Sequence, residues 1–166
     1  MLPHSASRAL GQWAPVPLRL IVGYGFIAHG YVKLARGPDT FAAVLHTLGV
    51  PAPHLLAWLT TLVELSGGLA VLAGAYVPLA ALPMVIVLLT ALFTVHLPYG
   101  FFSVKLAEVT AGGTKFGPVG YEVVLLYLAI LAALAVGGAG ALSIDGWRLA
   151  RVRTPRPGQT NGGSDA

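Results

Sequence analysis

Four long apolar stretches take up most of this chain, at about residues 17–34, 54–76, 78–99 and 119–138. Each holds about 17–23 residues, which in a helix rising 1.5 Å per residue is enough to cross a hydrocarbon core of ~30 Å. Only 10% of the residues are charged, whereas a soluble domain typically carries about 25%. Because so few polar side chains cannot cover a water-facing globule, the sequence predicts an all-α, integral membrane four-helix transmembrane bundle.

The segments around these stretches predict the domain organisation. Residues 40–48 carry apolar side chains at helical spacing, which favours a short interfacial helix between the first and second spans. Residues 101–118 are expected to form an outer loop. Residues 1–16 would be an N-terminal segment and 17–147 one membrane domain. The tail, 148–166, is first basic and then rich in Pro, Gly, Ser and Asn, so its end is expected to be disordered.

The basic residues predict the orientation in the membrane. More of them lie in the two terminal segments than in the two long loops, and they are Arg8, Arg19, Arg148, Arg151, Arg153 and Arg156. Since cytoplasmic segments carry an excess of Lys and Arg, and four spans leave both ends on one side, both termini are predicted to be cytoplasmic. The last four arginines directly follow the final apolar stretch without interleaved aromatic residues. This pattern favours anchoring at the lipid bilayer over binding of nucleic acid.

Ionisable side chains inside the apolar stretches predict where a site lies. A charge at the centre of a membrane helix costs at least ~2.5–3.5 kcal/mol, so such residues usually face the protein interior. Counting from the ends of the spans places one or two polar groups of every span in the outer half of the bundle. We therefore expect a shared site there, formed by His29, Lys33, Glu64, His96 and Glu122. At the inner boundary, Arg19 and Asp145 are expected to form a structural ion pair.

Three interpretations of the outer cluster remain open. Histidine and glutamate side chains relay protons, which fits a proton path or a quinone head-group site. The same groups are N and O ligands, so His29, Glu64, His96 and Glu122 form an alternative metal site. That alternative is less favoured because the depths are unequal and no helix carries a Glu-x-x-His pair. Thirdly, the groups hold the helices together or dock a partner subunit.

The chain contains no cysteine. Disulfides, thiolate nucleophiles and thiolate metal ligands are therefore excluded. Any redox role has to use a bound cofactor or the cofactor of a partner.

Short sequence pieces in a fixed order carry a family resemblance. They are Leu18-Arg19-Leu20, His29-Gly30-Tyr31-Val32-Lys33-Leu34, Phe41 with Leu48-Gly49-Val50-Pro51, Val63-Glu64-Leu65-Ser66-Gly67-Gly68, Gly120-Tyr121-Glu122 and Ser143-Ile144-Asp145. Together they span residues 17–147, and in this order the chain resembles the DoxX family of small four-span membrane proteins. The resemblance implies a multi-pass protein of the bacterial cytoplasmic membrane.

The same resemblance implies a function. Relatives include the membrane subunit of a thiosulfate:quinone oxidoreductase and members of other membrane oxidoreductase complexes. Five of the polar residues fall on the family pattern, Arg19, His29, Lys33, Glu64 and Glu122, and His96 lies where the third span often carries a polar residue. We therefore expect a membrane subunit of a quinone-linked redox system, with a quinone as cofactor and a soluble or membrane oxidoreductase as partner.

An oxidoreductase subunit is expected rather than a stand-alone enzyme, and the interpretation admits a homo-oligomer. The alternative is a non-enzymatic membrane scaffold or small-molecule carrier, in which the polar cluster is structural.

Overall fold

The structure, a computed structural model, describes residues 10–153. Its helices and strands, in chain order, are α2 Pro15–Ala35, α3 Pro38–Thr47, α4 Pro53–Ala73, α5 Val77–Ala91, the π-helical turn η1 Leu92–His96, the 3-10 turn η2 Leu97–Tyr99, β1 Leu106–Thr110, β2 Gly113–Phe116, α6 Glu122–Gly137 and α7 Ile144–Arg153. The prediction of a disordered end to the tail, Arg8 and Arg156 all lie outside the described residues.

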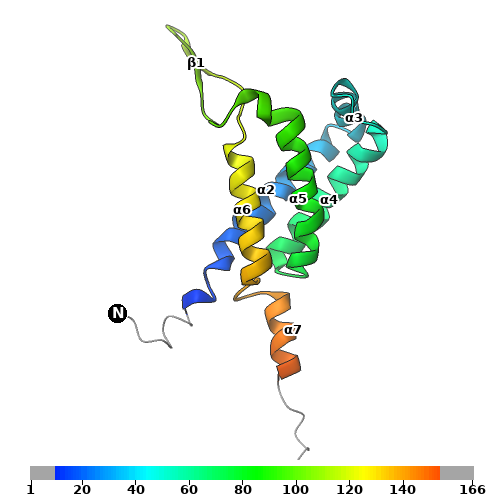
Figure 1. The fold of residues 1–166 in the computed structure, drawn as a ribbon, viewed down its shortest axis with the longest axis vertical. Helices are drawn as coiled ribbons and strands as arrows, with labels where there is room; N and C mark the ends of the chain where they lie inside the picture. Colours follow the sequence, from blue (N-terminus) through cyan, green and yellow to red (C-terminus); the bar gives the residue numbers. More distant parts are fainter. Residues whose placement is uncertain (1–9, 154–166) are drawn as a thin grey trace, which may run out of the picture.

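Four long helical segments form the body of the molecule: α2, α4, α5 with its two short turns, and α6 (Figure 1). The α3 helix and the β1–β2 hairpin lie at one end of this body, and α7 leaves the opposite end (Figure 1). We call these the α3 end and the α7 end. Successive long helices run in opposite directions (Figure 1).

A close backbone contact joins α2 to α4, and glycine makes it possible. A Cβ atom on Gly68 would lie 2.8 Å from the carbonyl oxygen of Gly23 and 3.0 Å from the backbone nitrogen of Ile27. A Cβ atom on Gly23 would lie 2.9 Å from the carbonyl oxygen of Gly68. Small residues let membrane helices approach this closely, so that backbone packs against backbone.

Apolar side chains from all four long helices fill the space between them. The main cluster of buried residues is Val22, Phe26, Val71, Val77, Ala81, Met84, Leu131, Leu134 and Ala139. A second, smaller cluster joins α3 to α4 through Ala42, Leu45 and Ala57. The predicted interfacial helix therefore forms, and its apolar face packs against α4 of the same chain.

The outer faces of the helices are also apolar. On α4 and α5 the exposed side chains include Leu55, Leu59, Leu62, Leu69, Leu79, Leu82 and Ile86. A water-facing surface does not carry apolar patches of this extent, whereas hydrocarbon accepts them at no cost. Two helical segments, Pro53–Ala73 and Val77–Tyr99, are long and apolar enough to cross a bilayer, and Glu122–Gly137 is apolar but shorter. The count of four spans stays a prediction.

One segment differs from the expected all-α fold. Residues 101–118 were expected to form a loop, but within them β1 and β2 pair antiparallel, with Thr110 opposite Gly113 at the turn. All residues of both strands are exposed. Gly113 has a φ of +134°, which a residue without a Cβ adopts readily, and the Glu108–Lys115 pair links the strands across the sheet at 3.0 Å.

The predicted Arg19–Asp145 ion pair does not form. The Arg19 guanidinium is buried and donates to four carbonyl oxygens instead, those of Ala139, Ala141, Leu72 and Leu142, at 2.7 to 3.1 Å. We call this set the Arg19 network. It joins the last turn of α4 to the connector that follows α6.

Asp145 has a different role at the same end of the bundle. Its carboxylate accepts hydrogen bonds from the backbone nitrogens of Tyr76 and Val77, at 2.9 and 3.1 Å, where α5 begins. Unpaired carbonyls at helix C-termini attract a cation, and unpaired N–H groups at helix N-termini attract an anion. Asp145 is therefore bonded by the N-terminus of α5, and Arg19 by the C-terminus of α4 and the connector after α6, rather than by each other.

The glycine contact predicts the effect of one added methyl group. Gly68→Ala should force α2 and α4 apart and lower the unfolding free energy by about 1–3 kcal/mol, the usual cost of overpacking. Gly137→Ala is the matched control, because a Cβ there meets no atom within 4 Å. Thermal unfolding in lipid nanodiscs, followed by circular dichroism, measures both. Equal melting temperatures for the two variants would contradict the close contact.

Candidate functional site

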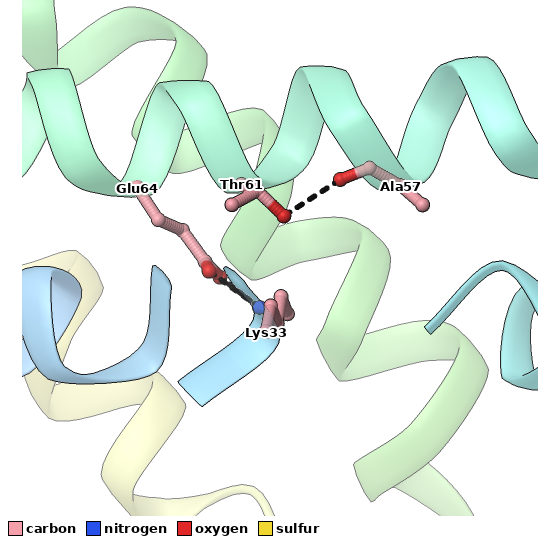
Figure 2. A network of polar contacts seen from close by, with 4 residues as sticks. All are labelled: Lys33, Ala57, Thr61 and Glu64. Carbon is pink, nitrogen blue, oxygen red and sulfur yellow. Dashed lines mark hydrogen bonds and ion pairs between the residues drawn. The ribbon is translucent and has the colours of Figure 1, made fainter. Parts of the chain in front are cut away.

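One ion pair joins α2 to α4 inside the bundle. The Lys33 ammonium group lies 2.5 Å from each carboxylate oxygen of Glu64. The Glu64 side chain is 6% exposed and that of Lys33 is 19% exposed, so little of the pair reaches the surface. Figure 2 shows the Lys33 side chain meeting Glu64 between the two helices. Of the predicted cluster, these are the two residues that the structure brings together.

The sequence around each partner explains how the pair fits. Glu64 lies about midway along α4, three and four residues before Gly67 and Gly68, on the face that packs against α2. A Cβ atom on Gly30 would lie 3.1 Å from the Cβ of Glu64, so the missing side chain of Gly30 leaves room for the glutamate. Buried Thr61, on the same side of α4 (Figure 2), donates to the carbonyl oxygen of Ala57 and needs no other partner.

A small pocket lies beside Lys33, between the end of α2 and the start of α3. It has a volume of about 130 Å³ and is lined by Val32, Lys33, Arg36, Gly37, Thr40, Phe41 and Val44. The Lys33 ammonium group lies 4.7 Å from the centre of the Phe41 ring, a cation–π contact. The pocket thus combines two cations, a hydroxyl group and one aromatic ring with apolar walls.

The other predicted site residues lie elsewhere. His29 is exposed on α2. His96 is half-buried, and its Nδ1 lies 3.0 Å from the carbonyl oxygen of Val119. The carboxylate of Glu122 accepts a hydrogen bond from the backbone nitrogen of Ser103 at 3.1 Å. His96 and Glu122 therefore fasten the two ends of the connector between η2 and α6, rather than lining a site with Glu64.

This arrangement corrects the expectation of one shared polar site. Within residues 10–153, no group of three or more His, Asp or Glu side chains is placed to hold a metal ion. The alternative ligand set His29, Glu64, His96 and Glu122 does not assemble. The reason is that unequal depths and different helix faces separate these side chains, each of which has a nearer partner or faces outward.

Part of the site was not predicted from the sequence. Arg36 and Thr40 were not expected to be site residues and Phe41 belonged only to the family pattern, although all three line the pocket next to Lys33. An exposed contact between α3 and α4 was not predicted either: His54 Nδ1 lies 3.1 Å from a carboxylate oxygen of Asp39. The available signal was the amphipathic pattern of residues 40–48, which predicted a helix but not its docking against the end of α2.

Comparison with known families identifies the chain. The family model of DoxX matches residues 14–97. The chain belongs to the DoxX family. The resemblance seen in the sequence is therefore confirmed, and a DoxX protein is a membrane protein, in agreement with the apolar outer faces of α4 and α5.

One relative has been found among curated proteins. An uncharacterized protein of Haemophilus influenzae is 26% identical over 130 residues, which are 77% of this chain and 85% of that protein. No solved structure matches the chain. The DoxX match contains Arg19, Lys33 and Glu64, so the Lys33–Glu64 pair and its pocket lie in the part of the chain that defines the family.

The burial of the ion pair predicts how its variants behave. Lys33→Met leaves a buried carboxylate without its partner, and Glu64→Leu leaves a buried ammonium group, so each should lower the unfolding free energy by about 3–5 kcal/mol. The double variant should lie much closer to wild type, because apolar residues often replace a buried pair at little cost. Unfolding in detergent micelles by titration with sodium dodecyl sulfate measures all three.

The exposed pair of the hairpin provides a matched control. Lys115 and Glu108 lie 3.0 Å apart and are largely exposed, so Lys115→Met and Glu108→Leu should each change the unfolding free energy by about 1 kcal/mol or less. Similar effects at the two pairs would mean that the Lys33–Glu64 pair is solvated rather than buried.

Proposed function

We propose that this DoxX protein is the membrane subunit of a quinone-linked redox system, and that the pocket beside Lys33 holds the quinone head group. The observation that carries the proposal is a buried ion pair bordering a pocket, in a bundle whose main core is apolar. Ionisable groups in such surroundings usually mark a functional site.

The lining of the pocket suits a quinone. A quinone head group is flat and carries two carbonyl oxygens that accept hydrogen bonds. Lys33 and Arg36 are donors on one wall, and the Thr40 hydroxyl group lies beside them, donating to the carbonyl oxygen of Arg36. Phe41 offers a ring face, and Val32 and Val44 offer apolar contact for the rest of the molecule.

The ion pair supplies groups that hold protons. Reduction of a quinone to a quinol takes up two electrons and two protons. The electrons would come from a partner oxidoreductase, because this chain has no cysteine and no described cluster of metal ligands. Lys33 and Glu64 are the proton-holding pair next to the pocket, whereas His96 and Glu122 bond to the connector and are left out of this role.

The proposal includes a membrane topology. In it, α2, α4, Val77–Tyr99 and α6 all cross the bilayer, 17–147 forms one membrane domain, and both termini are cytoplasmic. Supporting this, the four helices share one core, and the two terminal segments of the sequence carry more basic residues than the two long loops. A periplasm-dependent alkaline phosphatase fused after Arg153 should be inactive, and one inserted in the β1–β2 turn should be active. The reverse result would overturn the orientation.

A second function is favoured by a different observation. The charged groups of Arg19 and Asp145 both bond to backbone groups and so join separate segments of the bundle. If the Lys33–Glu64 pair works in the same way, the chain is a scaffold or small-molecule carrier without redox chemistry, which is the alternative.

Filling the pocket separates the two functions without breaking the ion pair. Val44→Trp narrows the pocket, while Val123→Trp, at a similarly exposed position of α6, is the control. Decylubiquinone should raise the melting temperature of wild type and of Val123→Trp in nanodiscs, since a ligand that binds the folded state stabilises it. It should have little effect on Val44→Trp.

A second readout tests the redox step itself. Membranes containing wild type or Val123→Trp should reduce added decylubiquinone faster than membranes with equal amounts of Val44→Trp. Two results together would favour the scaffold. The melting temperature of wild type would not change with decylubiquinone, and wild-type membranes would reduce decylubiquinone no faster than membranes with Val44→Trp.

A further inference from the structure

A groove runs along the outer surface between α4 and α5. It has a volume of about 440 Å³ and is lined by Val63, Ser66, Gly67, Ala70, Ala75, Tyr76, Leu79, Ala80 and Pro83. Small residues on both helices open this space, and no charged residue lines it. Val63 and Ala70, the outermost lining residues on α4, are seven residues apart, so the groove follows that helix for about 10 Å, a third of a hydrocarbon core of ~30 Å.

The groove ends in an aromatic and basic cluster at the α7 end. Tyr76 lines the groove, and the guanidinium carbon of Arg148 lies 4.5 Å from the centre of its ring. One turn further along α7, the guanidinium carbon of Arg151 lies 3.6 Å from the centre of the Trp147 ring. A guanidinium group stacked on a ring keeps its positive charge, which attracts a phosphate group.

Backbone contacts fix this cluster to the groove. The Asp145 carboxylate bonds to the backbone nitrogens of Tyr76 and Val77, and the backbone nitrogen of Asp145 bonds to the carbonyl oxygen of Gly74. Because Arg148 follows Asp145 by three residues, it lies on the same face of α7 and is held next to the start of α5. The cations are therefore in a defined position relative to the groove.

We propose that this surface binds one anionic phospholipid, with its phosphate group at Arg148 and Arg151 and one acyl chain in the α4–α5 groove. The charge of the arginines matches the head group, and the groove is apolar and long enough for part of one acyl chain. The site is at the opposite end from the Lys33 pocket and goes beyond the proposed redox function, on which it does not depend.

Titration with defined lipids tests the head-group half of the site. The purified chain in detergent is titrated with dioleoylphosphatidylglycerol or dioleoylphosphatidylcholine, and bound lipid is counted by native mass spectrometry. One molecule of phosphatidylglycerol should bind in preference to phosphatidylcholine. Arg148→Gln with Arg151→Gln should weaken the binding of phosphatidylglycerol about thirtyfold, since each arginine near a membrane surface contributes about one factor of five.

The control for charge removes two cations from the α3 end. Lys105→Gln with Lys115→Gln should leave binding within about twofold of wild type. Equal affinity for the two lipids, or equal losses in the two double variants, would overturn the head-group assignment. Displacement of phosphatidylglycerol by inorganic phosphate at a comparable concentration would do so too, by showing a site for free phosphate.

The acyl-chain half has its own pair of variants. Ser66→Leu fills the groove, and the hydroxyl group it removes bonds only within α4, to the carbonyl oxygen of Leu62. Thr90→Leu is matched, because Thr90 is also exposed, bonds within its own helix to Ile86, and lies outside the groove. Only Ser66→Leu should weaken lipid binding, and equal binding by both variants would overturn the groove assignment.

The alternative occupant of the α4–α5 groove is a second copy of the chain. Ser66→Cys introduces the only thiol of a cysteine-free protein, in the groove itself. Under oxidation in phosphatidylglycerol vesicles it should remain monomeric if lipid fills the groove. Rapid formation of a disulfide-linked dimer would show that a neighbouring copy packs there, and would overturn the proposal.

Discussion

A charged side chain inside hydrocarbon has to find its partners within the protein, because no water is present to solvate it. This constraint organises the two ends of the bundle in different ways. At the α7 end, Arg19 is satisfied by four carbonyl oxygens and Asp145 by two backbone N–H groups. Towards the α3 end, Lys33 and Glu64 satisfy each other. Backbone groups thus neutralise Arg19 and Asp145, whereas the carboxylate of Glu64, midway along α4, pairs with another side chain.

The close approach of α2 and α4 is what makes the second solution available. Glu64 leaves the middle of α4, where the backbone groups already bond within the helix, so its partner has to come from another side chain. Gly23 and Gly68 bring the helices together, and Gly30 leaves room for the glutamate stem. Lys33, near the end of α2, then reaches Glu64 while its stem borders the pocket with Phe41. The close contact between α2 and α4 therefore explains both the Lys33–Glu64 ion pair and the position of Lys33 beside the pocket.

Much of the fold was predictable from the hydropathy pattern and from the Pro and Gly residues between the apolar stretches. The first apolar stretch, expected at 17–34, is α2 at Pro15–Ala35, and the interfacial helix expected at 40–48 is α3 at Pro38–Thr47. The hairpin was missed because its strands are short, exposed and without a buried face, so they leave no alternation of apolar and polar residues to detect. The last helix, α7, runs from Ile144 to Arg153, where the described residues also end.

The candidate site was only partly predictable. Spacings of three and four residues predict that Glu64 shares a helix face with Gly67 and Gly68, and one of the three interpretations was that the polar groups hold the helices together. Spacing could not show how the four helices are rotated about their axes, which decides that His29 faces outward. Spacing also could not show that His96 and Glu122 would form hydrogen bonds with backbone groups of the connector. Hydrogen-bond partners that the backbone supplies cannot be predicted from the spacing of side chains alone.

The central claim is that the Glu64 carboxylate is buried between α2 and α4 and bonds through both oxygens to the Lys33 ammonium group. Infrared difference spectroscopy of the protein in lipid vesicles, with 13C-labelled glutamate and Glu64→Gln as the reference, observes that carboxylate directly. We expect its bands to differ in frequency between wild type and Lys33→Met, because the variant removes the group that bonds both oxygens. Identical Glu64 bands in wild type and Lys33→Met would contradict the claim.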